Sequence, residues 1–218
     1  RHGDNLSIAG FRALKGYLAI FAGQFSEALH QYQLAAPYMD AISGLYDVSV
    51  LAFLHGMVAF RRNEIAEGLN LKRRVRRWAH DVPENHRHRY LALQGAHFAS
   101  AGRLGRALKS YREARRLALS GRYIQEAALI AEWEGDLRRA KEVSGAAEPY
   151  HLAQSLYTEW GAGLAAERVR NTRGWTRSPD LVSPLILEEQ FVSRLVGADS
   201  VHEVVEATAE EMLRSSAA

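Results

Sequence analysis

The chain contains no cysteine, which excludes disulfide bonds and thiolate metal sites. Proline is also scarce, with 5 residues among 218, and few segments show the apolar and polar alternation typical of strands. No apolar run reaches the roughly 18 residues that cross a bilayer, and the first residues lack the parts of a signal peptide. We therefore expect a soluble, cytoplasmic protein that does not insert into membranes.

Motifs of catalysis and cofactor binding are missing as well. The sequence has no GxxxxGK[ST] loop, no GxGxxG, no HExxH and no kinase catalytic loop. We therefore expect a chain that binds no cofactor and is not itself an enzyme. It begins on "RHGDN" and ends on "EEMLRSSAA" within a helical pattern, so we expect it to be a fragment of a larger protein.

What the sequence does contain is helical periodicity. Long windows place apolar residues at i, i+3, i+4 and i+7, which predicts an almost wholly helical protein. Breaks are expected near Gly23, Asn63, Gly102 and Gly135. Longer gaps are expected at residues 37–44, 80–87 and 120–123.

Three segments, 16–35, 56–75 and 95–114, repeat with a period of about 40 residues. Each has a glycine, then a turn residue, then a small residue, in the sets Gly16, Gly23, Ala28; Gly56, Asn63, Gly68; and Gly95, Gly102, Ala107. Small residues let two antiparallel helices approach within about 8–10 Å, and a turn glycine supplies a left-handed helix end. We expect Tyr32 and Tyr111 to fill the space between one hairpin and the next.

This pattern resembles the tetratricopeptide repeat. Residues 95–114 and 16–35 match it well, whereas 56–75 match it poorly because Gly68 and Lys72 replace the usual alanine and aromatic residue. The resemblance implies an all-α fold, a right-handed superhelix (solenoid) of about four antiparallel helix pairs over residues 1–170. The alternative is an irregular helical bundle packed by the same small residues.

A fourth pair is expected from "YIQEAALIAEWEGDLRRAKEV", a helix broken or bent near Gly135, and "PYHLAQSLYTEWGAGLAAERVR", which we interpret as a second helix. The latter is similar to the helix that closes the tetratricopeptide-like region of multidomain signalling ATPases. Its matching residues are Tyr150, Leu152, Ala153, Tyr157, Trp160, Gly161 and Ala162, while Ala166 stands where lysine is usual. In that family, kinase-like and ATPase domains precede the repeats, and a GAF domain and a histidine kinase or other output domain follow.

The C-terminal part fits the same interpretation. Residues 171–184 are polar and interrupted by glycine and proline, which is typical of a linker. Residues 185–218 are expected to form two short amphipathic helices, similar to the start of a truncated GAF domain, that could pair with a second chain to form a homodimer.

Charge is distributed unevenly along the chain. Residues 61–122 hold 16 Lys and Arg against 5 Asp and Glu, whereas residues 123–218 hold 9 against 16. The expected basic face runs from residue 72 to 116 and includes Lys72, Arg73, Arg76, Arg77, Arg112, Arg115 and Arg116. Such a face could attract nucleic acid, an acidic partner or the acidic half of this chain, or it could be solvated. Aromatic residues are not interleaved at base-stacking spacing, which disfavours nucleic acid.

The histidines at 80, 86 and 88 could suggest a metal site. Arg87 and Arg89 are adjacent to His86 and His88, so we expect solvated polar side chains at the start of a helix and no bound metal.

The repeat register also predicts a mostly apolar concave groove with a basic end. Its expected lining is Tyr17, Ile20, Phe21, Phe53, Met57, Phe60, Arg61 and Arg89. The residues of the family's two-carboxylate clamp are not reproduced at Tyr17, Met57 or Ala96. An amphipathic helix fits this groove, either from a partner or from the region after residue 183, and so does a neighbouring domain of the intact protein.

These observations favour a non-catalytic interaction and sensing module of a larger signal-transduction protein. It would act as a scaffold in the regulatory region of a histidine kinase or similar output domain, relaying the binding of a protein or peptide. The alternative is a module that binds nucleic acid or an acidic partner through the basic face. The sensitivity of binding to salt separates the two.

Overall fold

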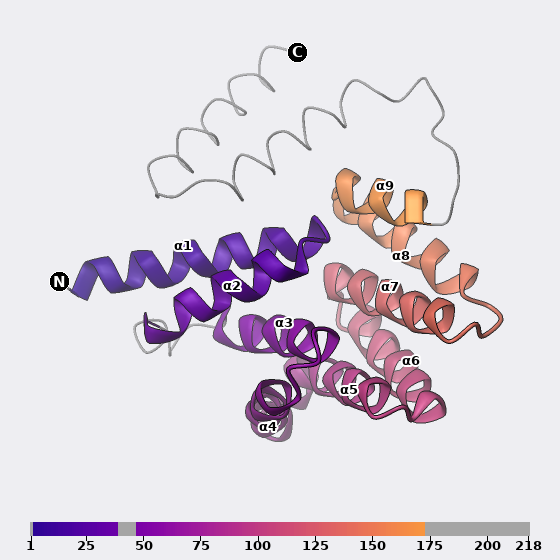
Figure 1. Ribbon diagram of the computed structural model, residues 1–218, viewed down its shortest axis with the longest axis horizontal. Coiled ribbons are helices and arrows are strands. Elements are labelled where there is room, and N and C mark those ends of the chain that lie inside the picture. Colours follow the sequence, from indigo (N-terminus) through magenta and orange to yellow (C-terminus); the bar gives the residue numbers. More distant parts are fainter. Residues whose placement is uncertain (1, 39–46, 173–218) are drawn as a thin grey trace, which may run out of the picture. The chain divides into compact units, whose positions relative to one another are not determined.

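The computed structural model describes residues 2–38 and 47–172, and these ranges contain helices and no strand (Figure 1). The all-α prediction is therefore confirmed. The helices are α1 (His2–Phe21), α2 (Phe25–Ala35), α3 (Asp47–Arg61), α4 (Ile65–Asp81), α5 (Pro83–Ser100), α6 (Leu104–Ser120), α7 (Ile124–Ala140), α8 (Ala147–Trp160) and α9 (Gly163–Thr172). None of the helices in these ranges is both long enough and apolar enough to span a bilayer.

The described helices belong to two compact units, one with α1 and α2 and the other with α3 to α9. In the first unit, α1 and α2 pack as a hairpin closed by the predicted turn at Gly23. The ring of Tyr32 lies on the backbone of Gly16, where an added Cβ would be 2.6 Å from Cε1 of the tyrosine. Tyr32 thus fills space within its own hairpin.

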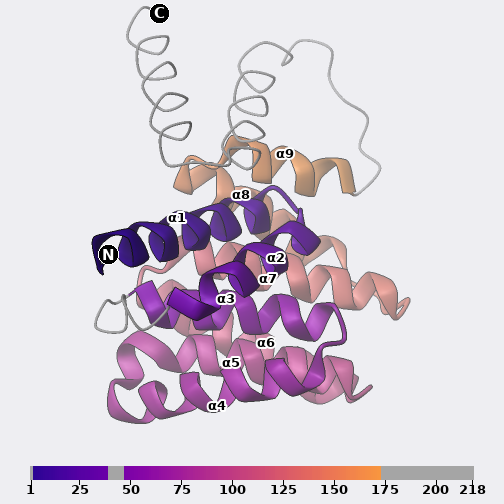
Figure 2. The same ribbon diagram turned by 60° about the vertical axis from the view of Figure 1, so that its left-hand side comes forward.

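In the second unit, each helix packs against the next along the chain, and α3 also packs against α5 (Figures 1 and 2). Small residues lie at these contacts, as the repeat predicts. Gly95 on α5 is covered by the ring of Tyr111 on α6, at 2.8 Å from the position of an added Cβ. In the preceding pair the positions are exchanged, and the ring of Phe60 on α3 covers Gly68 on α4. This exchange explains how segment 56–75 forms the same hairpin without the usual aromatic residue.

The ends of α1, α3, α5, α6, α7 and α8 share one hydrogen-bond pattern. At Gly102, whose φ is +71°, its own N–H donates to the carbonyl of Ala99, and the next N–H, of Arg103, donates to that of Phe98. This is the Schellman arrangement, in which a left-handed residue satisfies the last carbonyls of a helix. Asn63 adopts it as predicted, with φ of 64°. The same turn occurs at Arg122, within the gap expected at 120–123, and at two positions that we did not predict, Glu142 and Gly161.

Gly135 does not break a helix. It lies inside α7, which continues to Ala140, and an added Cβ would meet the ring of Tyr150 on α8 at 2.9 Å. Gly135 therefore corresponds to the helical glycines Gly56 and Gly95 and not to the turn glycines. The expected single helix after residue 149 was also wrong, because the left-handed Gly161 separates α8 from α9.

Two further expectations concern residues that are mostly not described. The predicted linker at 171–184 overlaps the structure only at residues 171 and 172, which end α9. The predicted helical segment at 185–218 and its dimer contact lie outside the described residues, as does most of the gap expected at 37–44.

Candidate functional site

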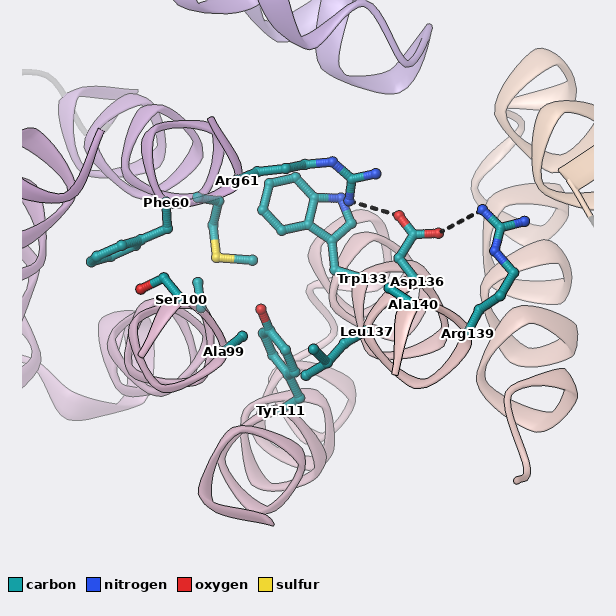
Figure 3. Close-up of a pocket in the computed structure, with 12 residues that line it drawn as sticks. Phe60, Arg61, Ala99, Ser100, Tyr111, Trp133, Asp136, Leu137, Arg139 and Ala140 are labelled. Atoms are coloured by element: carbon teal, nitrogen blue, oxygen red, sulfur yellow. Dashed lines mark hydrogen bonds and ion pairs between the residues drawn. The ribbon is translucent and has the colours of Figure 1, made fainter. Parts of the chain in front are cut away.

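A cavity of about 360 Å³ lies among α3, α5, α6 and α7 of the second unit (Figure 3). Its walls are mainly apolar, and charged side chains stand at one side. The lining residues are Met57, Phe60, Arg61, Ala96, Ala99, Ser100, Tyr111, Trp133, Asp136, Leu137, Arg139 and Ala140. This composition is typical of a binding site, in which apolar contacts supply area and a few polar groups fix orientation.

The cavity is built from equivalent positions of three helices. Counting from the helical glycines Gly56, Gly95 and Gly135, the residues one, four and five positions later all line it. They are Met57, Phe60 and Arg61 on α3, Ala96, Ala99 and Ser100 on α5, and Asp136, Arg139 and Ala140 on α7. Residues at these spacings share one face of a helix. Three successive hairpins therefore present the same face to one cavity.

The side chains of α3 and α7 are tied together at this cavity. Arg61 forms an ion pair of 2.7 Å with Asp136, and its guanidinium lies 5.3 Å from the ring centroid of Trp133 (Figure 3). The hydroxyl of Tyr150 donates a hydrogen bond of 2.6 Å to the same carboxylate. Arg139 lies 4.0 Å from it. A single carboxylate thus faces two guanidinium groups, which leaves positive charge at this side of the cavity.

Tyr111 lies against the wall of the cavity with its hydroxyl toward α3 and α7 (Figure 3). Burial raises the pKa of its phenol, Arg61 lowers it, and the carboxylates of Asp136 and Glu134 raise it further. The phenol consequently remains protonated and can donate or accept a hydrogen bond.

The residues predicted to line a groove are found in different places. Met57, Phe60 and Arg61 line the cavity, whereas Phe53 is buried in the core without lining it. Arg89 is also buried, at 1% exposure, and belongs to a polar network described below. Ile20, Phe21 and the half-buried Tyr17 are on α1 of the other unit, where the rings of Tyr17 and Phe21 lie 4.9 Å apart.

Five residues of α7 line the cavity and were not predicted: Trp133, Asp136, Leu137, Arg139 and Ala140. The signal that could have found them is the spacing of the glycines, since Gly135 follows Gly95 by one full repeat. We interpreted Gly135 as a turn. The residues of α7 were therefore not aligned with the equivalent positions of α3 and α5 in the repeat.

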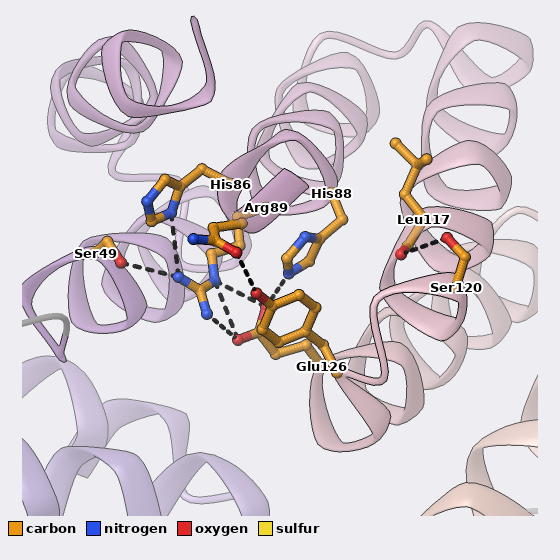
Figure 4. A network of polar contacts seen from close by, with 9 residues as sticks. Ser49, His86, His88, Arg89, Leu117, Ser120 and Glu126 are labelled. Atoms are coloured by element: carbon orange, nitrogen blue, oxygen red, sulfur yellow. Dashed lines mark hydrogen bonds and ion pairs between the residues drawn. The ribbon is translucent and has the colours of Figure 1, made fainter. Parts of the chain in front are cut away.

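A buried polar network links α3, α5 and α7 beside the core (Figure 4). The guanidinium of Arg89 donates hydrogen bonds of 2.7 and 2.9 Å to Glu126 and one of 2.8 Å to the hydroxyl of Ser49. His88 contacts the same carboxylate at 2.6 Å. Burial alone would raise the pKa of Glu126, but hydrogen bonds from His88 and Arg89 and their charges together lower it.

This network corrects the interpretation of the histidines. His86 and His88 are buried, at 8% and 1% exposure, and only His80 is exposed as predicted. The segment is almost entirely helical, because Pro83 occupies the first turn of α5, where its missing N–H costs nothing. Among the residues that the structure describes, no group of three or more His, Asp and Glu could hold a metal ion.

Helix α7 carries further buried carboxylates, each paired with an arginine. Glu134 accepts from Arg115 on α6 at 3.1 Å and from Arg138 at 2.9 Å. Glu132 pairs with Arg168 on α9 and accepts a hydrogen bond of 2.9 Å from Tyr157 on α8. With Glu126 and Asp136, these acids connect α7 to every other helix of the unit except α4. Some of the basic residues in 61–122 are therefore paired with acidic residues in 123–218 of the same chain.

The residues of the predicted basic face fall into two groups, those that contact another side chain of the protein and those that are exposed without an ion pair in the described ranges. Arg115 binds Glu134, Arg116 binds Glu113, and Lys72 contacts His97, so these cations have partners. Arg112 is exposed on α6 and donates to the carbonyl of Leu108. On α4, Arg73, Arg76 and Arg77 are exposed, and no ion pair within the described ranges involves them. They line a shallow hollow together with Asn70, Arg74, His80 and Asp81.

Comparisons of this chain with protein families, with curated proteins and with solved structures find no match. The geometry of the cavity and of the α4 surface must therefore support any functional conclusion.

Proposed function

We propose that α3 to α9 form a tetratricopeptide-like right-handed superhelix whose first helices, α3, α5 and α7, bind a protein or peptide partner. The observation that carries this proposal is the register of the cavity, which takes the same three positions from each of these helices. A repeat that presents one face again and again creates an extended binding surface.

The cavity suits an apolar side chain of the partner. Leu137 and Ala99 are half-buried and offer apolar area beside the buried Met57 and Trp133. Arg61 and Arg139 stand at the edge for polar or acidic groups next to that side chain. Large apolar side chains inserted in pockets supply most of the affinity in protein interfaces. Binding here would need no chemistry from the lining residues, so we propose a non-catalytic role.

In this proposal the chain is an interaction and sensing region of a larger cytoplasmic signalling protein, which relays binding to an output domain such as a histidine kinase. The support is the resemblance of residues 150–162 to the closing helix of such regions, and Tyr150, Tyr157 and Gly161 all have structural roles at the end of the unit. Neighbouring domains of the parent chain are alternative occupants of the cavity.

The test is a substitution that fills the cavity without removing a buried group. Peptides selected from a random library on the wild-type chain would be measured by calorimetry against Ala99→Trp, since Ala99 lines the cavity and is half-buried. The matched control is Ala101→Trp, two positions away in the exposed turn. We expect Ala99→Trp to abolish binding and Ala101→Trp to retain it. Equal affinity of both variants for every selected peptide would refute the cavity as the binding site.

The second candidate function is binding of nucleic acid or of an acidic partner through the basic face, and the hollow on α4 favours it. Arg73, Arg76 and Arg77 are neighbours there with His80. Counterion release makes such binding fall steeply with salt, whereas binding in the apolar cavity should change little. Binding that is lost at about 0.5 M salt and on reversal of these three arginines to glutamate would favour this function.

A further inference from the structure

A lysine and a histidine, neither of which lines the cavity, meet at the contact of α4 with α5. Nζ of Lys72 lies 2.8 Å from Nδ1 of His97, and both side chains are half-buried. The imidazole is held by ring contacts with Phe60 and Phe98, at centroid distances of 5.7 and 5.9 Å. The amine therefore has a proton acceptor at a fixed position.

The surroundings of this pair favour its uncharged forms. Burial first, and then the charge of Arg76, lowers the pKa of Lys72. Burial, followed by the charges of Lys72 and Arg103, lowers the pKa of His97. A lysine becomes a nucleophile when desolvation or a neighbouring cation increases the fraction of free amine, and a neighbouring base helps to remove the remaining proton.

We propose that Lys72 is a site of N-acylation by acyl phosphates, with His97 as the acceptor of the amine proton. The free amine attacks the carbonyl carbon and a C–N bond forms. The C–O bond to phosphate breaks, and phosphate leaves with the electron pair. The nitrogen loses one proton to Nδ1 of His97, which passes it to solvent, and the products are an amide and inorganic phosphate. No oxidant or reductant is required.

An anionic donor fits this position because of the charges on α4. Arg73, Arg76 and Arg77 are exposed within two turns of Lys72, and they attract an acyl donor that carries phosphate charge. Acylation would remove the charge of Lys72 from the basic face and leave a single amide N–H on its nitrogen. The proposal is independent of the partner that the cavity binds.

The chain contains its own reference amines. It has four lysines, and Lys109 and Lys141 are exposed in the second unit. We would incubate the full chain with acetyl phosphate and follow acetylation of each lysine by peptide mass spectrometry. We expect Lys72 to react at least about tenfold faster than Lys109 and Lys141, a modest part of the ~10²–10⁴ that general bases contribute. A Lys72 rate no higher than theirs would overturn the proposal.

The role of the imidazole is tested by His97→Phe, which keeps a ring between Phe60 and Phe98 but removes Nδ1. We expect this variant to lower the Lys72 rate to that of Lys109 while its circular dichroism stays unchanged. An unchanged Lys72 rate would overturn the assignment of His97. A second arm with an uncharged acetyl ester isolates the contribution of the arginines, because the preference for Lys72 should then decrease. An equal preference for both donors would overturn the choice of acyl phosphates.

Discussion

Arg61 on α3 and Asp136 on α7 are 75 positions apart in the sequence, and their side chains form an ion pair of 2.7 Å beside the cavity. The pair connects the hairpin that begins with α3 directly to the one that begins with α7. It also places the guanidinium over Trp133, so a single contact positions two parts of the cavity wall.

We expect the coupling of this pair to be measurable but small. A double-mutant cycle with Arg61→Met and Asp136→Asn should give a coupling of about 0.3–1 kcal/mol, because the side chain of Arg61 is 36% exposed and solvent screens the interaction. Chemical denaturation of the four proteins measures it. Raising the salt concentration should decrease the coupling, and a coupling of zero at low salt would contradict the predicted link.

The buried pair of Arg89 and Glu126 should contribute far more. Glu126→Gln leaves the guanidinium of Arg89 buried without a counter-charge, and we expect a loss of about 3–5 kcal/mol in the free energy of unfolding. The control is Glu113→Gln, which removes the exposed partner of Arg116 and should change stability little. Similar losses in the two variants would show that the network is not buried in solution.

The lowered pKa of Glu126 also gives a sign for the pH dependence. A carboxyl group with a lowered pKa in the folded state stabilises the protein above its unfolded pKa, and this contribution is lost as the pH falls through the folded pKa. When the pH is lowered below about 4, the denaturant concentration at the unfolding midpoint of the wild type should therefore decrease. This decrease should be smaller in Glu126→Gln.

His55 should produce a second pH dependence in a higher range. Burial, followed by the charge of Arg74, lowers its pKa from 6.5 to about 4. Below pH 6.5 the unfolded chain takes up a proton that the folded protein does not, so stability should decrease by roughly 1–3 kcal/mol as the pH falls to 4. Thermal melts at stepped pH measure the effect. His55→Gln should flatten this part of the profile, whereas His80→Gln, at an exposed position, should leave it unchanged.

Gly135 allows a direct test of the corrected register. Alanine is the better helix former, yet the added Cβ would meet the ring of Tyr150 at 2.9 Å. We expect Gly135→Ala to destabilise the protein by about 1–3 kcal/mol through overpacking. Gly105→Ala on α6 is the control, since nothing lies within 4 Å of its added Cβ, and it should gain up to about 1 kcal/mol. Stabilisation by both substitutions would refute the packing role of Gly135.

The sequence predicted the helical class, the three repeats and the turns at Gly23, Asn63 and Gly102, because glycine and asparagine mark left-handed positions in the local sequence. Arg122 and Glu142 adopt the same conformation, with φ of 62° and 53°. The sequence predicted a break at 120–123 but not which residue is left-handed, and it gave no sign of the turn at Glu142. At those two turns the packing of the flanking helices overrides the local cost of the left-handed conformation.

The candidate site was predicted less well, for two physical reasons. Met57, Phe60 and Arg61 follow from the repeat register, but the error at Gly135 removed the contribution of α7. His88 and Arg89 find their counter-charge at Glu126, 38 and 37 positions later, and such a pairing leaves no trace in the residues around it. A charged side chain therefore looks solvated in the sequence even where the fold buries it.

The carboxylates of α7 limit how freely these hairpins could be exchanged. Much of the backbone is modular, because the left-handed turns that close α1 with α2, α3 with α4, and α5 with α6 share one geometry. The charges are not modular, since Glu126, Glu132, Glu134 and Asp136 match arginines that come from four different helices. Moving or removing a hairpin would leave buried charged side chains without their counter-charges. Evolution of the second unit by gain or loss of repeats would thus require matched changes on α7.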